Sequence, residues 1–175
     1  MFLKYKPTWM VQAIYQLDPN QLKEKGIKAV LTDLDNTLIA WDNPDGTKEL
    51  YQWLEMMRKA KIPVVVISNN SAERIDRVIE ELSLDSIPRA LKPFSFGIKR
   101  AYKRLGLKKE EVVMVGDQLM TDIKAANNAG VRSILVSPVV ETDSWKTRIN
   151  RFFERRVMNH LVKKNPDMKW QGELK

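Results

Sequence analysis

The feature that most constrains this chain is an apolar run that ends in two carboxylates. Residues 27–32 are mostly aliphatic and include β-branched side chains, as is typical of a buried parallel strand. Asp33 and Asp35 follow at once, and Asn36 and Thr37 come with them. Because an unpaired carboxylate is very costly to bury, these residues form either a polar turn or a site with charged partners.

Polar side chains also follow later apolar runs. They are Ser68 and Asn69 after the run 62–67, Lys92 before Pro93, and Asp117 and Asp122 after the run 111–115. Ligands of an open parallel sheet bind outside the carboxyl ends of the strands, so we expect these side chains to converge with Asp33 and Asp35. Carboxylates and carbonyls suit Mg²⁺, which often keeps water and substrate phosphate among its ligands. The sequence therefore predicts a site for a divalent cation and a phosphoryl group.

These segments resemble, in order, the four motifs of the haloacid dehalogenase-like (HAD) phosphatases. The matching residues are Asp33-Leu34-Asp35-Asn36-Thr37-Leu38, Ser68 after Val-Val-Val-Ile, Lys92-Pro93, and Gly116-Asp117 through Thr121-Asp122. The resemblance covers about residues 27–137. Within the superfamily, the whole chain is similar to small capless members of the subclass IIIA type, the bacterial relatives of the mitochondrial phosphatidylglycerophosphate phosphatase.

The resemblance implies a role for each site residue. Asp33 is expected to attack phosphorus and form an aspartyl-phosphate, and Asp35 to serve as general acid and then base. The other expectations are Ser68, Asn69 and Lys92 for the substrate phosphate, Asp33, Asp117 and the backbone carbonyl of Asp35 for Mg²⁺, and Thr37 and Asp122 as supporting contacts. For Ser68 and Asp122, helix capping is the structural alternative.

Strands that alternate with helices predict a parallel α/β sheet with right-handed crossovers. Caps and apolar spacing predict helices from Thr47 to about Ala60, Ser71 to about Leu82, Ser95 to Gly106 and Thr121 to Gly130. The resemblance implies a Rossmann-like sheet of five strands in the order 5-4-1-2-3, with helices on both faces. It also implies no cap domain, since the interval from Asp35 to Ser68 and the interval from Ser68 to Lys92 are too short to hold one.

The chain is expected to form one domain with three parts: a helical N-terminal segment 1–26, a catalytic part 27–140, and a basic amphipathic helix and tail 141–175. Residues 7–17 have apolar side chains at helical spacing, which predicts a short helix. Its apolar stripe either docks on the core of the domain or, as a second interpretation, faces a membrane. Residues 166–175 are expected to fray.

The excess positive charge lies at the two ends. Residues 1–28 hold five Lys/Arg against two Asp/Glu, residues 141–175 hold nine against five, and residues 29–140 hold sixteen against fifteen. The C-terminal segment places Trp145, Ile149, Phe152, Phe153 and Val157 toward one side of a helix, and Arg148, Arg151 and Arg155 on another. This pattern is typical of an interfacial helix that binds an anionic membrane. The alternatives are a packed helix with a solvated arginine face and a merely soluble basic surface.

The composition and the apolar segments exclude several kinds of site and of membrane attachment. The absence of cysteine excludes disulfides, thiolate metal sites and a cysteine nucleophile. No apolar stretch is long enough to span a bilayer, and the N-terminus lacks the features of a signal peptide. We therefore expect a cytoplasmic enzyme that also associates with the inner face of the membrane.

The favoured hypothesis is a Mg²⁺-dependent phosphatase that converts phosphatidylglycerophosphate to phosphatidylglycerol. A phosphatase of nucleotides, nucleic-acid ends or phosphoproteins stays open, because basic ends also attract phosphate backbones. From another class, a HAD-like binding module with little turnover is the remaining alternative.

Overall fold

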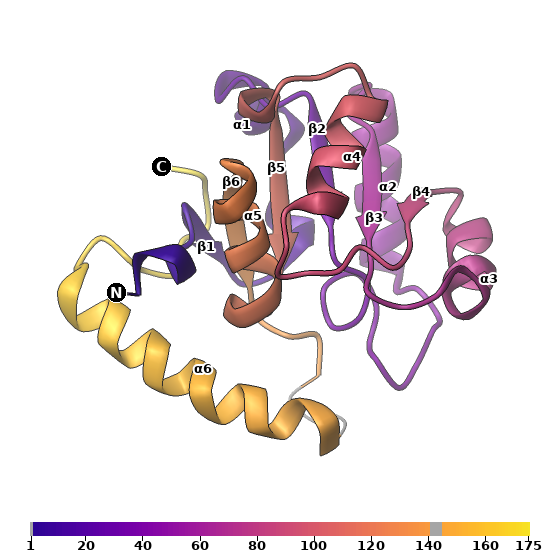
Figure 1. The fold of residues 1–175 in the computed structure, drawn as a ribbon. Coiled ribbons are helices and arrows are strands. Elements are labelled where there is room, and N and C mark those ends of the chain that lie inside the picture. Colours follow the sequence, from indigo (N-terminus) through magenta and orange to yellow (C-terminus); the bar gives the residue numbers. More distant parts are fainter. Residues whose placement is uncertain (1, 141–144) are drawn as a thin grey trace.

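A six-stranded parallel sheet forms the centre of the protein (Figure 1). The computed structural model describes residues 2–140 and 145–175, with only the backbone of residues 145–150. The strands are β1 Trp9–Val11, β2 Ala29–Thr32, β3 Val64–Ile67, β4 Asp85–Ile87, β5 Val112–Gly116 and β6 Arg132–Val136. Their order is β1-β6-β5-β2-β3-β4, and every neighbouring pair is parallel.

Helices cover both faces of this sheet. They are α1 Pro19–Glu24, α2 Lys48–Lys59, α3 Ala72–Leu82, α4 Phe96–Arg104, α5 Lys124–Ala129 and α6 Trp145–Lys164. Shorter helical turns are η1 Leu3–Tyr5, η2 Ile14–Gln16, η3 Lys109–Glu111 and the π-helical turn η4 Leu119–Ile123. The apolar sides of α1, α2 and α3 share one core cluster, while α4 and α5 build a second cluster on the opposite face. The predicted α/β class with helices on both faces is confirmed.

Local signals in the sequence fix several helix ends. Thr47 accepts a hydrogen bond from the backbone N–H of Leu50 at 3.2 Å, which is the cap expected for α2. Gly106 and Gly130 have positive φ angles of 69° and 70°, a conformation that glycine adopts without the steric strain that a Cβ would cause. The helix predicted to start at Thr121 instead begins as the turn η4 and continues into α5.

The predicted strand order 5-4-1-2-3 is confirmed and corresponds to β6-β5-β2-β3-β4. The prediction of five strands was wrong. A sixth strand, β1, lies at one edge, and its residues Trp9 and Val11 pair with Ile134 and Val136 of β6. The helix predicted over residues 7–17 was therefore wrong as well, because this segment holds β1 and the turn η2. All three residues of β1 are buried, so burial in the core confirms the docking interpretation over the membrane-facing one.

The C-terminal helix α6 is present as predicted, and it crosses the end of the sheet near β5 and β6 (Figure 1). Val157 and Leu161 are buried in a third apolar cluster with Leu119 and Ile123 of η4. The side chains of Trp145, Arg148 and Ile149, which belong to the predicted stripes, lie outside the described residues. Phe152 and Phe153 are half-exposed, so the predicted apolar stripe is buried only in part.

The last ten residues do not fray, contrary to expectation. The backbone N–H of Gln171 donates to Met10 at 2.8 Å and extends the edge of the sheet beside β1. Met168 and Leu174 are buried. The tail thus covers a strand edge that would otherwise expose unpaired backbone groups.

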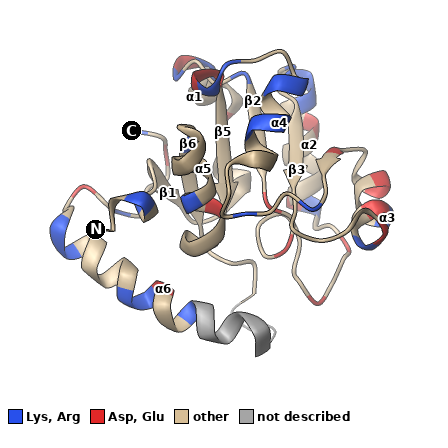
Figure 2. Cartoon of the chain, viewed as in Figure 1, with Lys and Arg blue, Asp and Glu red and all other residues tan. Residues whose placement is uncertain are grey.

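Basic side chains are not confined to the two ends of the chain. Figure 2 shows Lys and Arg on α6 and also on α4, which lies within the central part of the chain. Among the helices of the described chain, none combines the length and apolar character needed to cross a membrane.

Candidate active site

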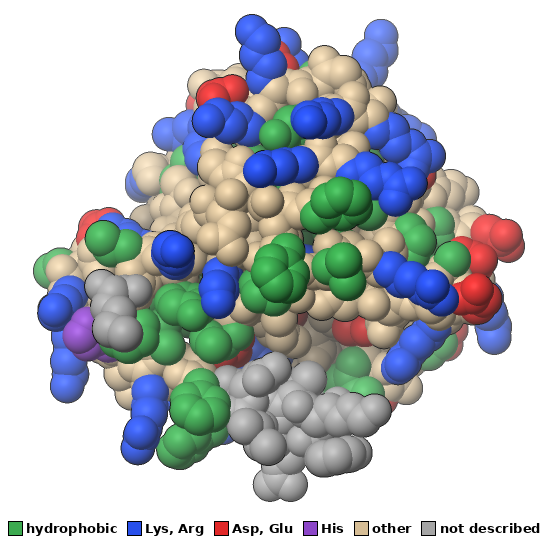
Figure 3. Space-filling view, viewed as in Figure 1, with side chains coloured by type: hydrophobic (Ala, Val, Ile, Leu, Met, Phe, Trp, Pro, Cys, Tyr) green, Lys and Arg blue, Asp and Glu red, His purple; other side chains and the backbone are tan. Residues whose placement is uncertain are grey.

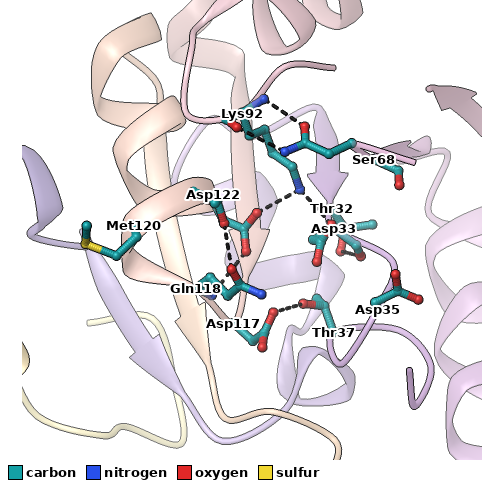
Figure 4. A network of polar contacts seen from close by, with 12 residues as sticks. Thr32, Asp33, Asp35, Thr37, Ser68, Lys92, Asp117, Gln118, Met120 and Asp122 are labelled. Carbon is teal, nitrogen blue, oxygen red and sulfur yellow. Dashed lines mark hydrogen bonds and ion pairs between the residues drawn. The ribbon is translucent and has the colours of Figure 1, made fainter. Parts of the chain in front are cut away.

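The site lies where β2, β3 and β5 end, and Figure 4 shows its polar side chains facing one another. Asp33 directly follows β2, and its backbone N–H continues the sheet by donating to Val115 at 2.9 Å. Asp35 lies two residues on, in a tight turn, and its Oδ2 accepts a hydrogen bond from Asn70 Nδ2 at 2.9 Å. The two carboxylates therefore have different neighbours.

Ser68, Asn69 and Asn70 follow β3 and form the next part of the site. Ser68 is buried, and its hydroxyl accepts the backbone N–H of Asn70 at 3.1 Å. Asn69 contacts the backbone of Lys92 twice: its Nδ2 donates to the carbonyl at 3.0 Å, and its Oδ1 accepts the N–H at 2.8 Å. The side chain of Asn69 thus positions Lys92, a contact that the sequence did not predict.

Lys92 links two of the acidic residues. Its Nζ lies 2.6 Å from Asp33 Oδ1 and 2.8 Å from Asp122 Oδ1, with the lysine side chain only 3% exposed. Burial lowers the pKa of Lys92, but the neighbouring carboxylates of Asp122 and Asp33 outweigh it and raise this pKa above its usual value. Lys92 therefore stays charged between the two acids.

Asp117 and Asp122 come from the end of β5 and the turn η4. Asp122 also accepts the backbone N–H of Gln118 at 3.1 Å, and Asp117 Oδ1 lies 3.4 Å from the hydroxyl of Thr37. Gly116 makes room for this packing, because a Cβ there would lie 2.3 Å from Asp122 Oδ2. Only glycine allows the strand to end this close to the carboxylate.

Three carboxylates could together hold a metal ion. One oxygen each from Asp33, Asp117 and Asp122 lies within 4.8 Å of the others. Asp33 and Asp117 belong to the predicted ligand set, while Asp122 was predicted as a supporting contact. The predicted ligand from Asp35 is its backbone carbonyl, which stays a prediction, and its carboxylate accepts a hydrogen bond from Asn70. Hard oxygen ligands of this kind suit a divalent cation such as Mg²⁺ or Mn²⁺.

The electrostatics of the cluster also fit a cation. Burial raises the pKa of Asp33 to about 8, helped by the charges of Asp122 and Asp117 and opposed by Lys92. Burial likewise raises the pKa of Asp117 to about 7, with Asp122 adding to the rise and Arg151 opposing it. These directions mean that the protein alone does not compensate the negative charge gathered here. A divalent cation would supply the missing positive charge.

Sequence reasoning missed two contributors from α6. Arg151 Nη2 lies 2.5 Å from Asp117 Oδ2, and Glu154 accepts the backbone N–H of Met120 at 3.0 Å. Arg151 was predicted to lie on an outward basic stripe, which was wrong: its side chain is 15% exposed and contacts the site. The arginine and its aspartate are 34 residues apart, so no local pattern could reveal the pair.

A parallel α/β sheet whose strands end in clustered carboxylates beside the buried Lys92 suits the chemistry of phosphoryl transfer. The comparison with protein families narrows this. Residues 1–130 match the model of the haloacid dehalogenase-like hydrolases, and the chain belongs to that family. The predicted superfamily is thereby confirmed.

Individual relatives agree with this assignment. The chain is 40% identical over 167 residues to the Bacillus subtilis (strain 168) protein named "Probable phosphatase YqeG", covering 95% of this chain and 96% of that protein. With the family match, this relative confirms the predicted enzyme class, a HAD-type phosphatase.

Solved structures share the fold. The 4-nitrophenylphosphatase of Thermotoga maritima matches with a TM-score of 0.57 and 14% identity, over 71% of this chain and 91% of that one. The cobalt-bound deoxy-D-mannose-octulosonate 8-phosphate phosphatase of Haemophilus influenzae matches with a TM-score of 0.52 and 18% identity, over 78% and 90%. At these identities, the likeness concerns the fold alone.

Proposed function

We propose that the protein is a Mg²⁺-dependent phosphomonoester hydrolase that works through an aspartyl-phosphate on Asp33. The contact that carries this proposal is the one between Lys92 Nζ and Asp33 Oδ1, at 2.6 Å. A buried ammonium group beside the carboxylate favours its ionised, nucleophilic form. The same ammonium group lies where it could bind the oxygens of a phosphoryl group attacked by Asp33.

The reaction would take two displacements. A carboxylate oxygen of Asp33 attacks phosphorus, the ester P–O bond breaks, and the departing alkoxide takes a proton from Asp35. Water then attacks the phosphorus of the aspartyl-phosphate while Asp35 accepts its proton, which releases inorganic phosphate and restores Asp33. The hydrogen bond from Asn70 holds one oxygen of Asp35 and leaves the other for this proton transfer.

The remaining site residues would bind the phosphoryl group and the cation. Ser68, Lys92 and the backbone amides near Asn69 would hold phosphoryl oxygens at the ends of β3 and of the loop before α4. Asp33, Asp117 and the carbonyl of Asp35 would hold Mg²⁺, supported by Thr37 and Asp122. When bound, the cation would neutralise charge on the phosphoryl oxygens.

For the substrate, we propose the phosphorylated headgroup of a lipid, most specifically phosphatidylglycerophosphate, which would yield phosphatidylglycerol. Three large apolar side chains beside Lys92 favour this: Leu91, Phe94 and Phe96 are 60%, 70% and 63% exposed. Exposed apolar side chains next to a functional site are typical of a surface that meets lipid or another partner.

Charge around this apolar patch supports the same substrate. The exposed basic residues Lys99, Arg100 and Lys103 follow on α4, and Figure 3 shows Lys and Arg side chains around hydrophobic ones on the face that carries this helix. Anionic lipid attracts such residues by about 1 kcal/mol each. We propose that the protein works as a peripheral enzyme on the inner face of the membrane.

The short crossovers after β2 and β3 favour a large substrate. Only α2 lies between β2 and β3, and only α3 and β4 lie between β3 and Lys92, so neither crossover carries a cap domain. Neither crossover would therefore stand between the phosphate of a lipid headgroup and the carboxyl edge of the sheet.

A phosphate-release assay tests the proposal. The wild-type protein with Mg²⁺ would receive phosphatidylglycerophosphate in anionic vesicles, a nucleoside monophosphate, 3′-phosphorylated DNA and a phosphopeptide, with Asp33→Asn as the matched inactive control. We expect the highest kcat/KM for the lipid. Preference for a soluble substrate would contradict the lipid proposal, and no release from any substrate by folded protein would contradict the enzyme proposal.

A further inference from the structure

Arg151 reaches the site from α6 and contacts two different oxygens of Asp117. Its Nη2 lies 2.5 Å from Asp117 Oδ2, and its Nη1 donates to the backbone carbonyl of Asp117 at 3.1 Å. The match to the HAD-like hydrolase family ends at residue 130, so α6 lies beyond the part of the chain that defines the family. The family likeness therefore assigns no role to this arginine.

The helix, rather than the arginine alone, sets the position of this contact. Glu154, one turn along α6, accepts Arg151 Nη1 at 3.2 Å and the backbone N–H of Met120 at 3.0 Å. Leu161 is buried against η4, the same turn that carries Asp122. Because α6 is fixed to η4 by apolar packing and by Glu154, the guanidinium group reaches Asp117 from a defined place.

Two contacts to one residue fix the orientation of its side chain. Arg151 holds both Oδ2 and the backbone carbonyl of Asp117, so the carboxylate cannot rotate without breaking a charge-assisted hydrogen bond. The other oxygen, Oδ1, lies on the side of Thr37, at the end of β2. One oxygen of Asp117 lies within 4.8 Å of one oxygen each of Asp33 and Asp122. Because Oδ2 is paired with Arg151, we assign Oδ1 to this group.

The charges of the connected cluster also indicate a cation in addition to the arginine. Among the side chains that the structure describes, ion pairs join Asp33, Asp117, Asp122 and Glu154 to Lys92 and Arg151. With all six groups ionised, two negative charges remain, which one divalent cation would balance. Arg151 thus complements a cation and does not replace it.

We propose that Arg151 is a positioning residue of the metal site, which holds the Asp117 carboxylate so that Oδ1 is available to a divalent cation. The proposal rests on the cation site of the proposed function, but it does not depend on turnover. It makes α6 part of the active site through one side chain, that of Arg151.

Calorimetric titration of metal-free protein with Mg²⁺, in the absence of substrate, tests this role. Arg151→Gln is expected to weaken Mg²⁺ binding by about tenfold to a hundredfold, the usual cost of losing a residue that orients a metal ligand. Arg151→Lys should recover part of the loss, since an ammonium group can contact one of the two oxygens. Arg155→Gln, one turn along the same helix, is the matched control and should bind Mg²⁺ as the wild type does.

A second control separates positioning from the simple docking of the helix. Leu161→Ala removes apolar packing from α6 without touching Asp117, so it should lower the melting temperature while leaving Mg²⁺ affinity near the wild-type value. If affinity falls as much in Leu161→Ala as in Arg151→Gln, helix docking alone explains the effect and the proposal is overturned.

The outcomes divide clearly. Unchanged or tighter Mg²⁺ binding by Arg151→Gln would overturn the proposal, and tighter binding would mean that the arginine competes with the cation for Asp117. If Arg151→Gln does not fold, Arg151→Lys decides: weaker binding supports the proposal and unchanged binding overturns it. A wild-type protein that binds Mg²⁺ but releases phosphate from no substrate would contradict the proposed function while leaving this role intact.

Discussion

Asn69 and Lys92 form a closed ring of two hydrogen bonds in which the side-chain amide of one residue holds the backbone of the other. Asn69 Nδ2 donates to the Lys92 carbonyl at 3.0 Å, and the Lys92 N–H donates to Asn69 Oδ1 at 2.8 Å. The lysine that contacts Asp33 and Asp122 is therefore fixed by the loop after β3, on the opposite side of the site from α6.

Replacing Asn69 by Ala should lower kcat on a small aryl phosphate by about a hundredfold, because a shift of roughly 1 Å in a catalytic group costs a factor of this size. Asn69→Asp keeps the oxygen that accepts the Lys92 N–H but loses the amide group that donates to the Lys92 carbonyl. Its kcat should therefore lie between those of the wild type and Asn69→Ala. Steady-state kinetics measure this, with a melting curve to show that each variant folds. Equal loss in both variants, or no loss in either, would contradict a positioning role.

Asp33→Asn should abolish phosphate release without unfolding the protein. Burial raises the pKa of Asp33, which means that its ionised form is costly in the metal-free protein. The neutral amide removes this cost and still accepts a hydrogen bond from Lys92, so we expect an unchanged or higher melting temperature in chelator. Residual turnover above a few per cent of wild type would rule Asp33 out as the nucleophile.

The stability of the metal-free protein should fall as the pH rises from about 4 to about 8. Asp33, with a pKa raised from 3.8 to about 8, and Asp117, with one raised to about 7, bind more protons in the folded state than in the unfolded state over this range. Their stabilising contribution is complete below pH 3.8 and is lost as the pH passes through the raised values.

Urea unfolding at pH 5 and pH 8 in chelator measures this effect, and saturating Mg²⁺ should reduce the difference because the cation favours the ionised carboxylates. The raised pKa of Lys92 does not oppose the trend, since this lysine stays charged in both states throughout the range. Stability that is the same at both pH values, or higher at pH 8, would contradict the excess of negative charge in the site.

The apolar patch beside Lys92 gives a prediction for membrane binding. The double variant Phe94→Ser and Phe96→Ser should lose binding to vesicles that contain anionic lipid, and should lose activity on a lipid phosphate. It should keep its kcat on a small soluble phosphate, because both rings face solvent, at 70% and 63% exposure, whereas Lys92 is buried. Phe152→Ser with Phe153→Ser, a half-exposed aromatic pair on α6, is the matched control. Equal vesicle binding by all three proteins would contradict the proposed surface.

The acidic part of the site could be predicted from the sequence because each residue lies at the end of an apolar strand. Parallel strands bring their carboxyl ends to one edge, so Asp33, Ser68 and Asp117 had to lie near one another once their strands were recognised. The roles given to these residues remain proposals, whereas their common location is a structural fact.

The remaining parts could not be predicted, for two physical reasons. Strand β1 has only three residues, all buried, and is followed by the buried Ile14 and Leu17, a pattern that fits helical spacing as well as a strand and a turn. The contact of Arg151 with Asp117 depends on how α6 docks, and the two residues are 34 positions apart in the sequence. From the sequence alone, a basic residue on an amphipathic helix is expected to face solvent. Tertiary contacts decided both cases.

Trapping the covalent intermediate tests the proposed chemistry most directly. Wild-type protein and Asp35→Ala would be mixed with a substrate carrying radiolabelled phosphate, quenched in acid, and digested for peptide mapping. We expect label on the peptide that contains Asp33, stable in acid and released by alkali or hydroxylamine, with more label in Asp35→Ala on an activated aryl phosphate, where loss of the base slows hydrolysis of the aspartyl-phosphate more than its formation. Phosphate release without any labelled protein, or label on a residue other than Asp33, would contradict the mechanism.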